Sequence, residues 1–189
     1  MEQEIKEIIV RYGSHILCSD TFRETFEQPH HYKTTVGDHT LGVTAEAVKL
    51  CLRYGQTADK TLENVVTSCL CHDLSMIGRD EKYRNNLQTL IWHPRHSAQV
   101  YQDLTGEDNE RVLNAIHSHM FPLKPSVPPK HREGWILTLA DKIISSKDFL
   151  NNMQLSPEER EEIMELAARA ESEEKQCGSQ ENQGEISES

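Results

Sequence analysis

Long hydrophobic runs are absent from this sequence. Apolar residues make up 36% and charged residues 27% of its 189 positions, and no apolar run approaches the roughly 20 residues that a membrane-spanning helix needs. The first six residues, Met-Glu-Gln-Glu-Ile-Lys, are acidic where a secretory leader would be basic, and no apolar stretch or small-residue cleavage site follows them. We therefore expect a cytoplasmic protein with no membrane partner.

Cysteines are few and show no regular spacing. The five of them are an odd number, and a reducing compartment would keep them as thiols, so we expect no disulfide bonds. Cys69 and Cys71 stand just before His72, as if in a metal site. Residues two apart on a helix, however, point about 200° apart, so both thiols cannot face a metal that His72 binds. We predict buried, inert thiols.

Positive charge is also scarce. The 20 basic and 31 acidic residues give a net charge of 20 − 31 = −11, and residues 171–189 alone hold six Glu and one Lys, or −5. The rest of the chain is mildly acidic. Long DNA or RNA is therefore not expected as a partner, because proteins that bind it present a basic surface to the phosphates. A small phosphorylated molecule is compatible with this charge.

Helical periodicity dominates the pattern that remains. We find no internal repeat, no glycine-rich phosphate loop and no alternating strand pattern longer than four residues, which indicates an all-α bundle of about six helices. Pro94 is expected to open the third helix, because proline is tolerated in a first turn. Ser156 and Glu159 have the capping-box spacing that announces the sixth. The expected helices lie around residues 41–52, 59–73, 93–106, 108–119 and 132–151, and from 156 onward.

The C-terminal residues differ in composition from the rest. Residues 171–189 are polar, charged and poor in apolar side chains, so burial cannot offset the entropy lost on ordering them. We expect residues 1–170 to form one domain and residues 171–189 to form a disordered acidic tail. The helix before this tail is expected to be solvated and peripheral.

Four ionisable side chains fall on apolar helix faces. His72 and Asp73 continue the apolar stripe of one expected helix. His119 ends the stripe of another, and Asp141 shares a face with Leu137 on a third. An unpaired buried carboxylate is strongly disfavoured, and such groups persist when they are paired or bind a metal, for which imidazole and carboxylate are usual ligands. A buried metal site is therefore predicted.

These residues resemble the signature of the HD phosphohydrolase superfamily. His39 in Asp-His-Thr-Leu-Gly-Val, the adjacent His72-Asp73 and Asp141 in Leu-Ala-Asp-Lys-Ile are similar to its H…HD…D motif in order and in helical context. The segments His-Pro-Arg-His at 93–96 and His-Ser-His at 117–119 resemble the added histidines of the two-metal branch, H…HD…H…H…D. That branch includes symmetrical diadenosine-tetraphosphate hydrolases. The resemblance covers about residues 30–150.

The resemblance implies an HD-domain helical bundle with a two-metal site. Asp73 would bridge the two ions, which makes it the implied catalytic residue. A hydroxide activated by the metals would attack phosphorus. The ions would be iron or manganese, with cobalt, nickel, zinc or magnesium as alternatives. The implied ligands are His39, His72, Asp73, His93, His119 and Asp141.

The resemblance also implies where a small phosphorylated, nucleotide-derived substrate would bind. Many relatives carry a lysine three residues after the Asp of the HD pair, whereas this chain has Met76. Arg79 is a candidate for the missing charge. His15, His30 and His131 are expected to be ordinary histidines. The segment His-His-Tyr-Lys at 30–33 nevertheless lies just ahead of His39 and could border the pocket, with His31 and Lys33 as its weaker candidates. The substrate-facing candidates are Arg79, Arg95, His96, His117 and Lys142.

Two other functions use the same residues. A mixed-valent di-iron centre with these ligands could activate oxygen, as in the more distantly similar inositol and phosphonate oxygenases. A metal-binding regulatory protein without catalysis is the third interpretation. Spacing along the chain does not separate them, and it does not indicate the oligomeric state.

Overall fold

The computed structural model describes residues 1–30, 34–150 and 155–184, with the backbone alone for 177–184. These residues form helices and no strand, apart from an isolated bridge between Pro29 and Thr35. The all-α prediction is confirmed. None of the described helices is both long and apolar enough to cross a bilayer. The elements are α1 (Gln3–Leu17), α2 (Asp20–Glu24), α3 (Val36–Arg53), α4 (Asp59–Cys71), the 3₁₀ turn η1 (Leu74–Met76), α5 (Arg79–Lys82), α6 (Asn86–Thr105), α7 (Glu110–Ser118), α8 (Arg132–Phe149) and α9 (Pro157–Gly184).

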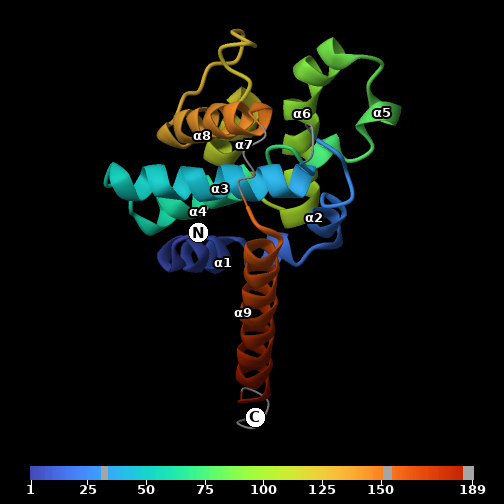
Figure 1. Ribbon diagram of the computed structural model, residues 1–189. Helices are drawn as coiled ribbons and strands as arrows, with labels where there is room; N and C mark the ends of the chain where they lie inside the picture. The colour runs from blue at the N-terminus through green and yellow to red at the C-terminus, as the bar shows by residue number, and fades with distance from the viewer. Residues whose placement is uncertain (31–33, 151–154, 185–189) are drawn as a thin grey trace.

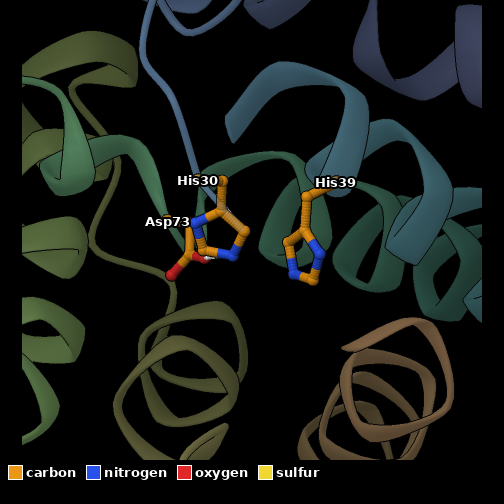
Figure 2. A group of neighbouring side chains, drawn as sticks. All are labelled: His30, His39 and Asp73. Carbon is orange, nitrogen blue, oxygen red and sulfur yellow. Dashed lines mark ion pairs between the residues drawn. The ribbon is translucent and has the colours of Figure 1, made fainter. Parts of the chain in front are cut away.

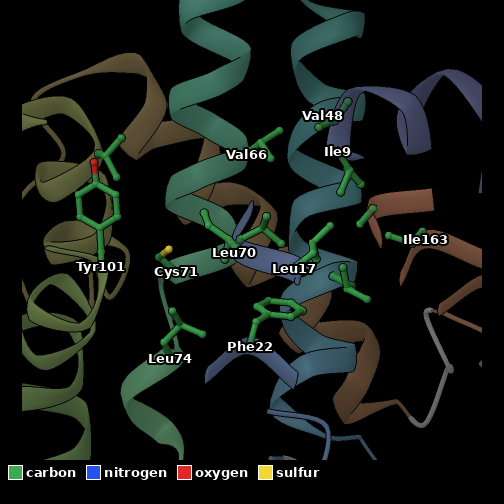
Figure 3. Close-up of a cluster of buried hydrophobic side chains, with 14 of the residues drawn as sticks. Ile9, Leu17, Phe22, Val48, Val66, Leu70, Cys71, Leu74, Tyr101 and Ile163 are labelled. Carbon is green, nitrogen blue, oxygen red and sulfur yellow. The ribbon is translucent and has the colours of Figure 1, made fainter. Parts of the chain in front are cut away.

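Helices α3 and α4 lie side by side in the middle of the molecule (Figure 1). Helices α7 and α8 pack on one side of this pair, and α1, backed by α9, packs on the other. One core cluster, shown in Figure 3, includes Ile9, Ile16, Leu17, Phe22, Val66, Leu70, Tyr101 and Ile163. A second cluster includes Val43, Ala47, Val65, Cys69, Ala115, Leu137 and Ile144.

Helix α4 is buried on both of its faces. Val66 and Leu70 belong to the first cluster, whereas Val65 and Cys69 belong to the second. Every residue from Asn64 to Cys71 is buried, so this helix carries its last residues into the centre of the domain. His72 follows directly as its C-terminal cap residue.

Helix α1 is a main part of the core that the sequence did not lead us to expect. Its Ile5, Ile9 and Ile16 are buried with helical spacing. Gly13 allows α1 to approach α4 closely, since a Cβ there would lie 2.4 Å from Leu70 Cδ1. The helical spacing of these apolar residues is visible in the sequence, but we considered this segment only as a possible secretory leader.

The start of α6 corrects a prediction. We expected the helix to open at His93-Pro94, but it begins at Asn86 and contains Pro94. Asn85 caps it, because its side-chain oxygen accepts a hydrogen bond from the Gln88 backbone N–H at 2.9 Å. This cap outweighs the preference of proline for a first turn.

The last helix matches its predicted start and extends further than predicted. Ser156 and Glu159 form the reciprocal hydrogen bonds of a capping box. Ile163 is buried against the first core cluster, so α9 is not fully solvated. The helix continues through residues 171–184, where composition predicts disorder. Glu and Lys are good helix formers, and a Glu171–Lys175 ion pair at 3.0 Å spans one turn. Residues 185–189 lie outside the described part.

The thiols behave as predicted where they are described. Cys18, Cys51, Cys69 and Cys71 are free, and the last three are buried. Burial raises the pKa of the Cys51 thiol to about 11, which keeps it protonated and unreactive at neutral pH. The side chain of Cys177 lies outside the described residues.

Candidate metal centre

Five helices bring polar side chains to one buried point. His39 lies in the first turns of α3, and His72 and Asp73 follow the last residue of α4. Asp141 lies in the middle of α8. His93 comes from α6, and His119 caps the end of α7. All six of these side chains are buried, so the structure brings together the whole set that the sequence singled out.

The six residues fall into groups with the spacing of metal ligands. His39, His72 and Asp141 form one group, and within it the ligand atoms all lie within 4.8 Å of one another. Asp73, His93 and His119 form a second such group, and a third combines His30 with His39 and Asp73.

Asp73 lies between the groups. Its Oδ2 is 3.4 Å from His72 Nε2. Its Oδ1 is 3.4 Å from His93 Nε2 and 3.7 Å from His119 Nε2. One carboxylate therefore offers one oxygen to each group, which is the arrangement of a bridging ligand.

Hydrogen bonds fix the orientation of all four histidine rings in these first two groups. In each ring Nδ1 donates to an oxygen that can only accept, so Nε2 is the atom left to face the centre. Ligand histidines of metalloproteins are commonly held in this way. The acceptors are Asp148 Oδ2 at 2.8 Å for His39, and the carbonyl oxygens of Cys69, Thr89 and Ile116, each at 2.7 Å, for His72, His93 and His119.

The arrangement of polar atoms fits a bound cation. His93 Nε2 and His119 Nε2 are 2.9 Å apart, and because each neutral ring already donates through Nδ1, two lone pairs face each other. His72 Nε2 and Asp73 Oδ1 are buried without a hydrogen-bond partner. Unsatisfied buried polar atoms are costly, and metal ions bound between these groups would satisfy them.

The electrostatics leave the ligands ready to bind. Burial lowers the pKa of His93, and burial together with the charge of His93 lowers the pKa of His119 to about 3, so both rings are neutral at neutral pH. Burial alone would raise the pKa of Asp73, but the neighbouring histidines, His72 foremost, hold it far below its usual range. The carboxylate is therefore charged.

His39 behaves differently. Burial disfavours its charged form, but hydrogen bonds to Asp141, at 3.2 Å from Nε2, and to Asp148 raise its pKa to about 10. The pKa of Asp141 stays well below its usual value despite burial, because of His39 and Lys142. Without a metal, a proton therefore lies between His39 and Asp141, where a cation would replace it.

A cavity of about 460 Å³ opens onto these ligands. This volume is in the range of small-molecule sites. Asp73, His93, His119 and Asp141 line it together with His30. The remaining wall mixes polar and apolar side chains, namely Met76, Arg79, Asn86, Thr89, Leu90, Met120, Leu123, Lys142 and Ser145.

Two of the five substrate-facing candidates line this cavity. Arg79 and Met76 both line the cavity. Lys142 Nζ donates to Asp141 Oδ2 at 2.5 Å and to the carbonyl of His119 at 3.2 Å. Both side chains bring positive charge to the rim of the ligand cluster.

The other three candidates do not line the cavity. Arg95 and His96 are exposed on α6, and His96 Nδ1 is 2.9 Å from the hydroxyl of Tyr83. His117 is half-buried on α7, where burial and nearby cations lower its pKa. Their roles toward substrate stay predictions without support from this geometry. His31 and Lys33 lie outside the described residues.

Two residues of the centre escaped the sequence reasoning. Asp148, the acceptor of His39, is seven residues after Asp141 on α8, and this spacing could have revealed it. The sequence suggests for His30 at most a place at the border of the pocket, yet its Nε2 is 3.9 Å from Asp73 Oδ2 (Figure 2). It lies between helices, where no periodicity marks the inward face.

A protein-family model matches the central part of the chain. The family model described as HD domain matches residues 36–145, which is more than half of the chain and includes all six buried ligand candidates. No curated protein matches the chain, and no solved structure does. Helices α1 and α9 and the residue His30 lie outside the matched segment.

Proposed function

This chain belongs to the HD domain family, and we propose that it is a metal-dependent phosphohydrolase with two metal ions, acting on a small phosphorylated, nucleotide-derived molecule. The family suggests metal-dependent phosphohydrolysis, and the buried His and Asp groups could hold the ions. The main support for a second metal ion is the approach of His93 Nε2 to His119 Nε2, whose lone pairs face each other at 2.9 Å. Two such lone pairs repel each other unless a cation or a proton lies between them.

The two sides of Asp73 define the proposed ligand sets. His39, His72, Asp141 and Asp73 Oδ2 would hold one ion, and His93, His119 and Asp73 Oδ1 the other. Imidazole and carboxylate donors without a thiolate suit first-row ions such as iron and manganese. When bound, such ions neutralise phosphoryl oxygens and make an attacking water more acidic.

The other residues of the cavity would bind and orient the substrate. Arg79 and Lys142 supply positive charge for the phosphate oxygens that the metal ions leave uncovered. Leu90, Met120 and Leu123 form an apolar wall for the part of the substrate beyond the phosphate. A cavity of about 460 Å³ favours a molecule of nucleotide size over a long polymer.

Metal removal and replacement tests this function. Protein stripped by a chelator should be inactive, and iron or manganese, added without oxygen, should restore phosphate release from at least one member of a panel of nucleotides, dinucleoside polyphosphates and sugar phosphates. Oxygen consumption is measured on the same samples in air. Metal-loaded protein that takes up oxygen with an organic substrate and releases no phosphate would identify an oxygenase instead. Full activity in metal-free protein would contradict the proposal.

A further inference from the structure

His30 lies at the metal centre although it is carried by a loop. Its ring centroid is 4.4 Å from that of His39, its Nε2 is 3.9 Å from Asp73 Oδ2, and its side chain is only 6% exposed. Figure 2 shows His30 and His39 pointing into the same space beside Asp73. The ligand atoms of the three residues lie within 4.8 Å of one another.

Backbone hydrogen bonds hold the loop that carries His30. The His30 N–H donates to the Thr34 carbonyl at 3.0 Å, and the Val36 N–H donates to the Gln28 carbonyl at 2.9 Å. The side chain of Gln28 in turn accepts from the Gly78 N–H at 2.8 Å. His30 is therefore tied both to the start of α3, which carries His39, and to the segment that follows Asp73.

Gly37 brings the start of α3 close to this loop. Its N–H donates to the Thr25 carbonyl at 3.1 Å. A Cβ at Gly37 would lie 2.5 Å from Phe26 Cδ1. This close approach needs a residue without a side chain. Gly37 in the first turn of α3 therefore helps to fix the position of the loop.

We propose that His30 is a further metal ligand, for the ion on the Oδ2 side of Asp73. This inference rests on the proposed metal centre. His30 approaches the same Asp73 oxygen as His72 does, whereas His93 and His119 face the other oxygen. Ligand atoms that share an ion through bonds of about 2 Å lie about 3 Å apart, so a shift of about 1 Å would bring His30 into place.

Cobalt(II) binding tests this role with the metal alone as the probe. Metal-free wild-type protein and the His30→Ala, His30→Gln and His15→Ala variants are titrated with Co²⁺ against a competing chelator. Both His30 variants should bind one of two ions at least about tenfold more weakly and leave the affinity for the other unchanged. His15 is exposed on α1, so its variant should match wild type.

Spectra of the loaded protein separate a ligand from a residue that only shapes the loop. In ¹⁵N-histidine-labelled, Co²⁺-loaded wild type, the His30 ring should give strongly shifted signals, which disappear in His30→Gln while those of His39 and His72 remain. Unchanged affinity and an unshifted His30 ring would overturn the proposed role of His30 and leave the metal centre itself uncontradicted. Loss of both ions with a changed circular-dichroism spectrum would also overturn it, because a fold defect would then explain the result. A wild-type protein that binds no Co²⁺ would instead contradict the metal centre itself.

Discussion

The ligand groups on the two sides of Asp73 contain different numbers of carboxylates. On the Oδ2 side, His39 and His72 are joined by Asp141, and Asp148 supports His39 from behind. On the Oδ1 side, His93 and His119 share Asp73 as the sole carboxylate of their ligand group. An ion on the Oδ2 side therefore meets two carboxylates and an ion on the Oδ1 side meets one. Because attraction between charges is strong at a buried site, we expect tighter binding on the Oδ2 side.

The largest effect is expected from removing the residue that both sides share. Asp73→Ala should lower bound metal on both sides and abolish phosphate release, while the helical circular-dichroism signal stays largely intact. Metal analysis and phosphate release measure this. Asp103→Ala, at an exposed position of α6, is the matched control and should behave as wild type. Wild-type turnover in Asp73→Ala would show that the site is assigned to the wrong residues.

Removing one ligand of the Oδ1 side should delete one ion. His93→Ala or His119→Ala should lower bound metal from about two per chain to about one, because the ligands of the other side remain. Activity should fall with it. His96→Ala and His117→Ala remove neighbours that do not line the cavity and should keep about two ions. Equal loss in His96→Ala and none in His93→Ala would mean that the neighbouring histidine is the ligand.

Replacing Asp148 should weaken metal binding on the Oδ2 side of Asp73 only. Asp148→Asn keeps the size of the side chain and removes the charge that holds His39 Nδ1 at 2.8 Å. Changes behind a ligand usually weaken a metal site by about 10–100-fold, so one of the two affinities should fall by that amount. Chelator competition measures both. A loss confined to the weaker ion would contradict the assignment of Asp148 to the tighter side.

Proton release should distinguish the sides without any mutation. With a pKa of about 10 in the metal-free protein, His39 is protonated at pH 7 and must lose that proton to bind an ion. Affinity on the Oδ2 side should therefore rise about tenfold per pH unit from pH 7 to 8. The pKa of His119 is about 3, so affinity on the Oδ1 side should change little. Mn²⁺ calorimetry in two buffers of different ionisation enthalpy measures the protons released, and equal release from both sides would refute the difference.

Helical periodicity explains how much of this centre the sequence could predict. His72, His119 and Asp141 continue apolar stripes, so the stripe itself predicts that they point inward. Asp148 obeys the same rule, but it stands seven residues beyond the motif. His30 obeys no such rule, because it lies in a loop. The position of this loop depends in part on a residue that is distant in the sequence, since the Gly78 N–H donates to the side-chain oxygen of Gln28.

The helix boundaries show where local preferences compete. Pro94 and Asn85 both signal a helix start, and only the folded chain shows that the asparagine cap prevails. Residues 171–184 are helical although burial, the criterion that predicted disorder, is absent from the sequence pattern there, and the Glu171–Lys175 ion pair supports the first turn of this stretch. Only the tertiary packing shows that α1 covers one face of α4.

That cover sets a practical limit on how the protein can be divided for expression. The family segment, residues 36–145, contains the six ligand candidates of the sequence motif but excludes α1 and His30. A fragment cut at those boundaries would turn Val66 and Leu70, against which Gly13 packs, toward water. Exposed apolar patches of this kind promote aggregation. The smallest fragment that remains in solution should therefore begin near residue 1, well upstream of the segment by which the family is identified.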